Sequence, residues 1–143
     1  LVVRTAWLYG LHGRNFVKTM LQLASERPCL KVVADQRGCP TFSGDLAGMI
    51  GKLLAHPAQG VLHVTNAGNC TWHEFATEIV RLSGRPVPVE AITTADMPRP
   101  AKRPAYSVLS ADRLHHLGFT MPSWQDGLQR FMKALPAVSS AVS

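Results

Sequence analysis

Short apolar runs alternate along this chain with longer stretches of helical spacing, and this alternation constrains the fold more than any other feature. Strands are predicted over residues 1–8, 30–34 and 61–65, because each is a short apolar run that ends at turn residues. After each strand, apolar residues recur every three or four positions, as they do on one face of an amphipathic helix. A strand–helix–strand–helix–strand–helix order predicts an α/β fold.

The predicted helices carry start and stop signals. Asn15 can accept a hydrogen bond from the free backbone N–H groups of the first helix, and Ser43 is expected to cap the second. Thr71 followed by Glu74 is the pattern of a capping box at the start of the third helix. A proline or a glycine follows each helix and is expected to end it: Pro28, Pro57 and Gly84.

The last third of the chain is less regular. A short strand is predicted over residues 87–92, and the prolines and basic residues of 93–105 indicate an extended loop. A brief strand over 106–109 and a short helix over 110–117 follow. Ser123 then opens a last amphipathic helix.

Length and composition suit one globular domain or half of a larger one. The 143 residues are 46% hydrophobic with a mean hydropathy of +0.04, which argues against disorder. No apolar run approaches the roughly 20 residues that cross a bilayer. Because the chain opens at Leu1 with an apolar run, we expect it to be cut from a longer protein. The small and polar residues 136–143 are expected to form a flexible tail.

Cysteine content indicates the cellular compartment of the protein, and its charge indicates the kind of ligand that it could bind. Three cysteines without a CxxC pair indicate a reducing compartment, and we expect a cytoplasmic protein. The net charge is +6, and the basic residues concentrate in 1–55 and 99–143. Two basic ends that converge could bind a phosphorylated ligand, whereas a solvated basic surface is the simpler alternative. Nucleic-acid binding is not expected, because no RRM, KH or zinc pattern occurs and aromatic residues are not interleaved with basic ones.

No complete active-site signature occurs in the sequence. There is no GxSxG or HExxH, and the six histidines lack the spacing of metal ligands, so no metal site is expected. Residues 10–13 form only GxxG, not the GxGxxG of a dinucleotide-binding turn. Neither tyrosine is followed by a lysine four residues later.

Four local features suggest a ligand site, and each also has a simpler explanation. Trp7, near the end of a predicted strand, could face a sugar ring or could be part of the core. Asn15 and its helix could meet a phosphate, or Asn15 could be only a cap. The polar residues 35–41 follow a strand, although many such loops are only turns. Arg103, in a proline-stiffened loop, suits a diphosphate, although an exposed arginine often serves only solubility.

Six segments occur in a recognisable order: RTAWLYG, GRNFVKTMLQLA, VVADQRGCPTFSGDLA, GVLHVTNAGNCTWHEFA, RPAKRPAYSVLSADRL and SWQDGL. Together, over about residues 2–135, they resemble the carboxyl-terminal half of dTDP-4-dehydrorhamnose reductases, which are extended short-chain dehydrogenases. The resemblance implies that residues 1–135 are the substrate-binding part of a Rossmann-type fold, including its last strand and helix elements. The amino-terminal dinucleotide-binding part would be missing.

The resemblance also implies a reaction. Such enzymes use NADPH or NADH to reduce the C4 keto group of dTDP-4-dehydro-L-rhamnose, which gives dTDP-L-rhamnose for cell-surface polysaccharide. A Tyr-x-x-x-Lys pair supplies the proton, and a Ser or Thr helps to polarise the carbonyl. In the family these groups lie upstream of the matching segments. We therefore expect no catalytic residue in this chain, and no activity from the chain alone.

The family's binding roles map onto seven residues of this sequence. The implied substrate-binding residues are Trp7 on the sugar, Asn15 and Arg103 on the diphosphate, and Gln36 and Thr41 near the nucleotide. Thr5 and Ala6 would lie near the nicotinamide through backbone contacts.

Two further expectations concern partners and the alternative function. Without the missing sheet, an exposed strand edge is expected to make the chain self-associate or form a homo-oligomer. The alternative is a non-catalytic binding or regulatory module, because a regulatory subunit of methionine adenosyltransferase shares the implied fold. An upstream Tyr-x-x-x-Lys pair would favour the enzyme.

Overall fold

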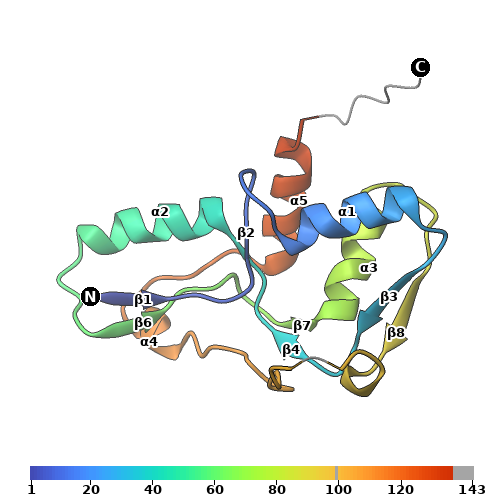
Figure 1. Cartoon of the computed structure of the whole chain (residues 1–143). Helices are drawn as coiled ribbons and strands as arrows, with labels where there is room; N and C mark the ends of the chain where they lie inside the picture. Colours follow the sequence, from blue (N-terminus) through green and yellow to red (C-terminus); the bar gives the residue numbers. More distant parts are fainter. Residues whose placement is uncertain (99, 137–143) are drawn as a thin grey trace.

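The computed structural model describes residues 1–98 and 100–136 of the chain. The elements form two lobes that lie side by side along the long axis of the molecule, with short strands at their junction (Figure 1). Of the predicted tail, residues 137–143 lie outside the described part. Within the described ranges, no helix is both long enough and apolar enough to cross a membrane.

The first lobe contains the amino terminus and is built on a parallel pair of strands. β1 (Val2–Arg4) pairs with β6 (Val61–His63), and α2 (Ser43–Leu54) and α4 (Asp112–His116) pack around this pair. Five buried residues form its core: Met49, Leu53, Leu62, Val64 and Leu114. In α2 the two core residues are four positions apart, so they lie on one face of the helix.

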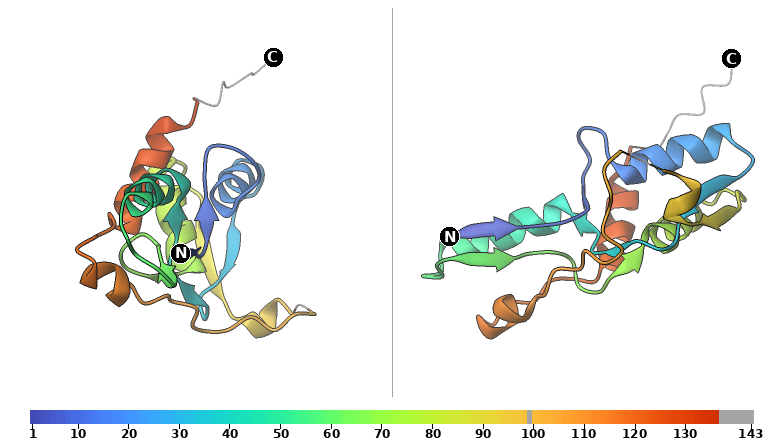
Figure 2. Two further views of the ribbon diagram at one scale, coloured as in Figure 1. Left: turned by 90° about the vertical axis from the view of Figure 1, so that its left-hand side faces the viewer. Right: turned by 60° about the horizontal axis from the view of Figure 1, so that its bottom comes forward.

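The second lobe is larger and lies at the opposite end of the molecule (Figure 2). β3 (Leu30–Val33) pairs in parallel with β8 (Val89–Ile92), and this lobe also contains three helices, the second of which packs directly on the pair. They are α1 (Phe16–Glu26), α3 (Trp72–Leu82) and α5 (Trp124–Ala134). Aromatic and aliphatic side chains of all three helices share one core, so this lobe holds most of the buried apolar surface.

Two short strand pairs join the lobes. β2 (Leu8–Tyr9) runs parallel to β5 (Thr41–Phe42), and β4 (Arg37–Gly38) runs antiparallel to β7 (Cys70–Thr71). The ring of Tyr9 is 2% exposed and is surrounded by other aromatic rings. Burial raises the pKa of its phenol well above the ordinary value, so Tyr9 stays neutral and acts as a core residue.

The single strand predicted over residues 1–8 is wrong. The chain forms β1 and β2 as separate strands, and Trp7 lies between them with a φ of 45°. This value belongs to the left-handed region, which breaks an extended strand. The two pieces pair with different partners, β6 and β5, so tertiary pairing overrides the continuous apolar pattern.

Four other predictions are corrected. Residues 35–41 contain β4 and the start of β5, and the strand predicted over 106–109 is only a bridge between Arg37 and Tyr106. Ser43 is the first residue of α2 and not its cap, since Phe42 occupies that position without a side-chain hydrogen bond. A short η1 (Thr94–Asp96) lies within the predicted loop. Such two-residue pairings depend on partners far away in sequence, so local patterns do not reveal them.

The other helix signals are confirmed. Asn15 Oδ1 accepts the Lys18 N–H at 3.1 Å, and Ser123 caps α5. Thr71 and Glu74 form the predicted capping box, with hydrogen bonds of 3.0 and 2.7 Å. The backbone hydrogen bond from Thr71 holds the pKa of Glu74 below its usual value. Gly84 follows α3 with a φ of 69°, a conformation that glycine adopts without strain.

Candidate functional site

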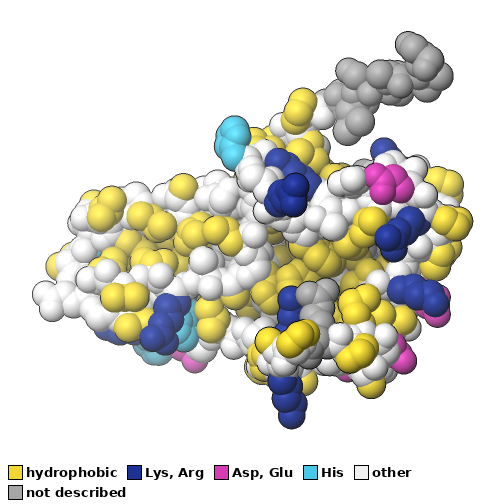
Figure 3. All heavy atoms as spheres, viewed as in Figure 1, with side chains coloured by type: hydrophobic (Ala, Val, Ile, Leu, Met, Phe, Trp, Pro, Cys, Tyr) yellow, Lys and Arg dark blue, Asp and Glu magenta, His cyan; other side chains and the backbone are white. Residues whose placement is uncertain are grey.

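Two adjoining pockets lie between the start of α3 and the loop that follows β8. The larger, about 450 Å³, is lined by Ala6, Trp7, Gln36, Trp72, Arg103, Pro104 and Ser107. The smaller, about 230 Å³, is lined by Val33, Gln36, Thr94, Met97, Pro98, Pro100, Ala101, Lys102 and Arg103. Gln36 and Arg103 line both, so the two form one depression, called here the central groove. Figure 3 shows a hollow with a largely hydrophobic floor below α1 and basic side chains at its lower rim.

Trp7 enters the groove from the break between β1 and β2. Its indole stacks on the ring of Trp72, with 3.5 Å between the ring centroids and 8° between the planes. One face of Trp7 is therefore covered, and only the remaining part of the indole is available to a ligand. The edge of the indole that contains Nε1, Cε2 and Cζ2 lies close to Gly38, where an added Cβ would come within 2.4 Å of Cε2.

Gln36 forms part of the groove wall and is 6% exposed. Its side-chain amide donates to Thr94 Oγ1 at 3.0 Å. The Thr94 hydroxyl and backbone N–H both donate to Asp35, each at 2.8 Å. These hydrogen bonds hold the pKa of the Asp35 carboxyl below its usual value. The bond from the Thr94 backbone N–H has the larger effect. The polar loop after β3 is therefore fastened to η1 on the other side of the smaller pocket.

The rim of the groove is basic. Lys102 and Arg103 are both exposed and both line the smaller pocket. None of the described residues that line the two pockets is acidic. An exposed cationic rim above an apolar floor suits a ligand that combines an anionic group with a flat or apolar part.

Four of the seven predicted site residues come together in this groove: Ala6, Trp7, Gln36 and Arg103. Thr5 lies beside them in sequence but lines neither pocket, and its hydroxyl is buried without a hydrogen-bond partner among the described residues. Only one of the two residues expected near a nicotinamide therefore faces the groove.

Asn15 and Thr41 line neither pocket. Asn15 uses both ends of its side-chain amide locally, because Oδ1 caps α1 and Nδ2 donates to the Gly10 carbonyl at 2.8 Å. Thr41 is fully buried, and its hydroxyl donates to the Cys39 carbonyl at 3.3 Å. Both residues hold backbone in place, and neither directs a free polar group into the groove.

Sequence reasoning missed Trp72, Lys102 and Ser107 as groove residues. Trp72 fits the apolar stripe of its helix, and this stripe explains its position without a site. The available signal was its place at the first position of the helix, directly after the cap Thr71, where a side chain can face outward from the helix end. Within residues 1–98 and 100–136, no cluster of histidine, cysteine and carboxylate side chains could hold a metal ion.

Comparison with known proteins identifies close relatives. The family profile described as "RmlD substrate binding domain" matches residues 1–136. A crystal structure of dTDP-4-dehydrorhamnose reductase from Bacillus anthracis with NADP superimposes with a TM-score of 0.89 at 46% identity, covering 92% of this chain and 47% of that one.

Two curated relatives extend the comparison. A probable dTDP-4,6-dihydroxy-2-methyloxan-3-one 4-ketoreductase from Streptomyces antibioticus is 46% identical over 98% of this chain and 48% of its own length. The spore coat polysaccharide biosynthesis protein SpsK from Bacillus subtilis is 42% identical over 92% of this chain and 46% of its own. The chain thus spans about half the length of the curated relatives it matches.

Proposed function

The chain belongs to the family of RmlD substrate-binding domains, and from this membership we propose that it is the sugar-nucleotide-binding half of a reductase. The substrate would be dTDP-4-dehydro-L-rhamnose, whose C4 keto group is reduced with NADPH or NADH to give dTDP-L-rhamnose. The observation that carries this proposal is the convergence of Ala6, Trp7, Gln36 and Arg103 on one groove with a basic rim.

Different residues of the groove would contact different parts of the substrate. Arg103 and Lys102 would neutralise the diphosphate, since a guanidinium donates several hydrogen bonds to phosphate oxygens. The uncovered part of the Trp7 indole would pack against the apolar side of the sugar ring. Gln36, held by Thr94, would fix the width of the pocket that receives the nucleotide. Asn15 and Thr41 would support the groove through the backbone that they hold.

The residues present do not fit a dinucleotide cofactor. The sequence has no GxGxxG turn and no Tyr-x-x-x-Lys pair, and only Ala6 of the two expected residues faces the groove. When bound, the nicotinamide would supply the hydride. We place its binding site and the proton donor on a part of the enzyme that this chain does not contain. The chain by itself would bind the sugar nucleotide and leave it unreduced.

Calorimetry with dTDP tests the proposed site. The wild-type chain is expected to bind dTDP weakly, and Arg103→Ala is expected to weaken binding by about tenfold or more, because charge-assisted hydrogen bonds contribute about 1.5–3 kcal/mol. Trp7→Ala is expected to weaken the binding of dTDP-L-rhamnose, because the indole would contact the sugar ring that dTDP lacks. Raising the salt concentration should weaken wild-type binding and leave the residual binding of Arg103→Ala less affected.

Arg27→Ala is the matched control for the loss of a positive charge. Arg27 is exposed after α1 and lines neither pocket, so its replacement should leave dTDP binding unchanged. Absence of binding by the wild-type chain at millimolar dTDP would contradict the proposed function. Equal losses of dTDP affinity in Arg27→Ala and Arg103→Ala would mean that net charge, and not the position of Arg103, determines binding.

We also propose that the chain associates through the open side of β1 in the cytoplasm. Leu1, Val2, Leu8 and Leu54 are at least half exposed, which is unusual for so many large apolar side chains. In the described part, β1 pairs only with β6, so its other edge has free backbone groups. The cytoplasm suits three cysteines that are all free.

Analytical ultracentrifugation tests this association. The wild-type chain is expected to sediment as dimers or larger species, and Val2→Lys is expected to shift it toward monomer, because a charged edge strand opposes pairing. Lys31→Ala, on the exposed face of β3, serves as a control that should not change the distribution. A monomeric wild-type chain at high concentration would refute the proposed association.

A further inference from the structure

We infer that Trp72 is a positioning residue that fixes the indole of Trp7 at the floor of the central groove. The inference deepens the proposed function, because it assigns a second tryptophan to the same site. Its first test needs no ligand, so it can fail independently of that function.

The backbone of Trp7 needs outside support. Its φ of 45° makes it the one described residue other than glycine with a positive φ. The left-handed region is unfavourable for a bulky side chain, and such residues persist where surrounding contacts hold them. The Trp7 carbonyl accepts the Thr41 N–H at 3.1 Å, which ties the break between β1 and β2 to β5.

Two contacts hold the side chain of Trp7. The stack on Trp72, at 3.5 Å and 8°, covers one face of the indole. Gly38 approaches the edge of the Trp7 indole that contains Nε1, Cε2 and Cζ2 so closely that an added Cβ would lie 2.6 Å from Nε1 and from Cζ2. The indole therefore occupies a slot between an aromatic ring and a bare stretch of backbone, and this slot sets its orientation.

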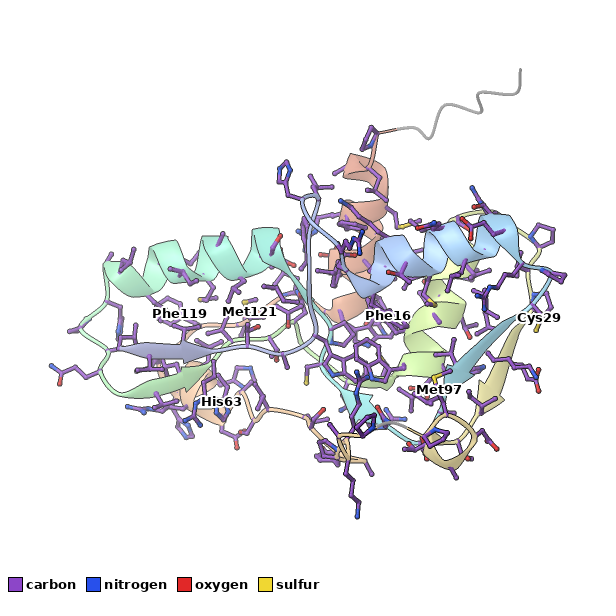
Figure 4. All side chains as sticks on the ribbon, viewed as in Figure 1. Phe16, Cys29, His63, Met97, Phe119 and Met121 are labelled. Carbon is purple, nitrogen blue, oxygen red and sulfur yellow. The ribbon has the colours of Figure 1, made fainter. Side chains whose placement is uncertain are left out.

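Trp72 is itself well anchored. It is the first residue of α3, directly after Thr71, the N-cap of the capping box, and its backbone N–H donates to the Gln36 carbonyl at 3.3 Å. The ring of Phe16 packs against it with 4.5 Å between centroids. Figure 4 shows Phe16 below the start of α1, at the junction of the lobes.

These contacts couple the orientation of Trp7 to the rest of the groove. β4 contributes Gly38 and follows Gln36, whose carbonyl receives the Trp72 N–H. Arg37 between them bonds Asn69 at 2.8 Å and Glu74 at 3.3 Å, which draws β4 toward the start of α3. A ligand would thus meet an indole whose orientation is already fixed, which lowers the entropic cost of binding.

The ligand-free test uses the small number of tryptophans, which are Trp7, Trp72 and Trp124. In a Trp124→Phe background, Trp72→Phe and Trp72→Leu each leave Trp7 as the sole indole. Time-resolved fluorescence anisotropy then reports the local motion of that ring. We expect Trp7 to remain immobile with phenylalanine at position 72 and to gain fast local motion with leucine, while urea unfolding shows that both variants are folded. Equal mobility in the two would overturn the inference.

Gly38→Ala provides a second, independent variant because it keeps all three tryptophans. The parallel stack of two indoles should give an exciton couplet in the circular dichroism spectrum of the wild-type chain. Gly38→Ala is expected to abolish that couplet by displacing Trp7, and Trp124→Phe is expected to preserve it. If the couplet persists in Gly38→Ala, Gly38 does not help to hold the indole of Trp7 against Trp72.

Binding completes the test. Trp72→Leu is expected to weaken the binding of dTDP-L-rhamnose about three- to tenfold, the value of a lost aromatic pair, and Trp72→Phe is expected to restore most of it. Unchanged affinity in Trp72→Leu would overturn the positioning role. If the wild-type chain does not bind dTDP, the proposed function fails, while the anisotropy and dichroism results still decide whether Trp72 positions Trp7.

Discussion

Replacing Asp45 by alanine is expected to lower the free energy of unfolding by about 2–3 kcal/mol, less than a fully buried ion pair because Arg130 is partly exposed. The Asp45 side chain is 8% exposed and accepts two hydrogen bonds from Arg130, each of 2.7 Å. Asn66 donates a third at 2.7 Å. Alanine would leave the buried Asn66 amide without this partner and the guanidinium without its bidentate acceptor.

The network connects parts of the chain that are far apart in sequence. Asp45 lies in the first turn of α2, Arg130 on α5, and Asn66 after β6. Asn66 Oδ1 also accepts the Phe42 N–H at 2.8 Å, and Nδ2 donates to the Pro122 carbonyl at 3.1 Å. Loss of Asp45 should therefore loosen the junction between the lobes as well as lower stability.

Asp126→Ala is the matched control, measured by urea unfolding. Asp126 also pairs with Arg130 at 2.7 Å, but it is 53% exposed, so its removal should cost less than about 1 kcal/mol. Equal effects of Asp45→Ala and Asp126→Ala would contradict a central role for the buried carboxylate.

The same network sets a pH dependence. Burial raises the pKa of Asp45, but the hydrogen bonds from Arg130 and Asn66 outweigh it and hold the pKa below its ordinary value. The pKa of Asp45 is lower in the folded than in the unfolded state. The contribution of the Asp45 carboxylate to stability is therefore fully present above pH of about 4 and is lost as pH falls through the folded pKa. Urea unfolding of wild type and Asp45→Asn should therefore differ at pH 7 and converge in strong acid.

Replacing Phe75 by alanine is expected to have the largest effect on stability, a loss of about 3–5 kcal/mol. Phe75 is 1% exposed, and its ring contacts Tyr9 at 5.6 Å and both Phe16 and Trp124 at 5.7 Å between centroids. These partners come from β2, α1 and α5, so alanine would open a cavity where three elements meet.

Phe75→Leu separates the cavity from the loss of an aromatic ring. Leucine fills most of the space, so it should cost less than about 1.5–2 kcal/mol. Urea unfolding followed by tryptophan fluorescence and by near-ultraviolet circular dichroism would measure both variants. A cost below about 1 kcal/mol for Phe75→Ala would mean that Phe75 is not central to this core.

The sequence determined the elements whose signals are local. Asn15, Thr71 with Glu74, and Ser123 start helices where expected, because a cap needs only a side chain within three residues of a free N–H. The α/β order and the family resemblance drawn from six segments are confirmed by the structure and by the family match. The roles of individual residues in binding remain predictions.

Tertiary structure alone decided the groove. Residues 1–8 look like one strand, and the break at Trp7 arises because β1 and β2 pair with strands more than 30 residues away in the chain. The stack of Trp7 on Trp72 and the bare backbone of Gly38 bring together three distant segments, and the hydrogen bond from Asn66 to Asp45 joins two more. Contacts of this kind depend on how separate elements pack, and propensity and periodicity describe only neighbours along the chain.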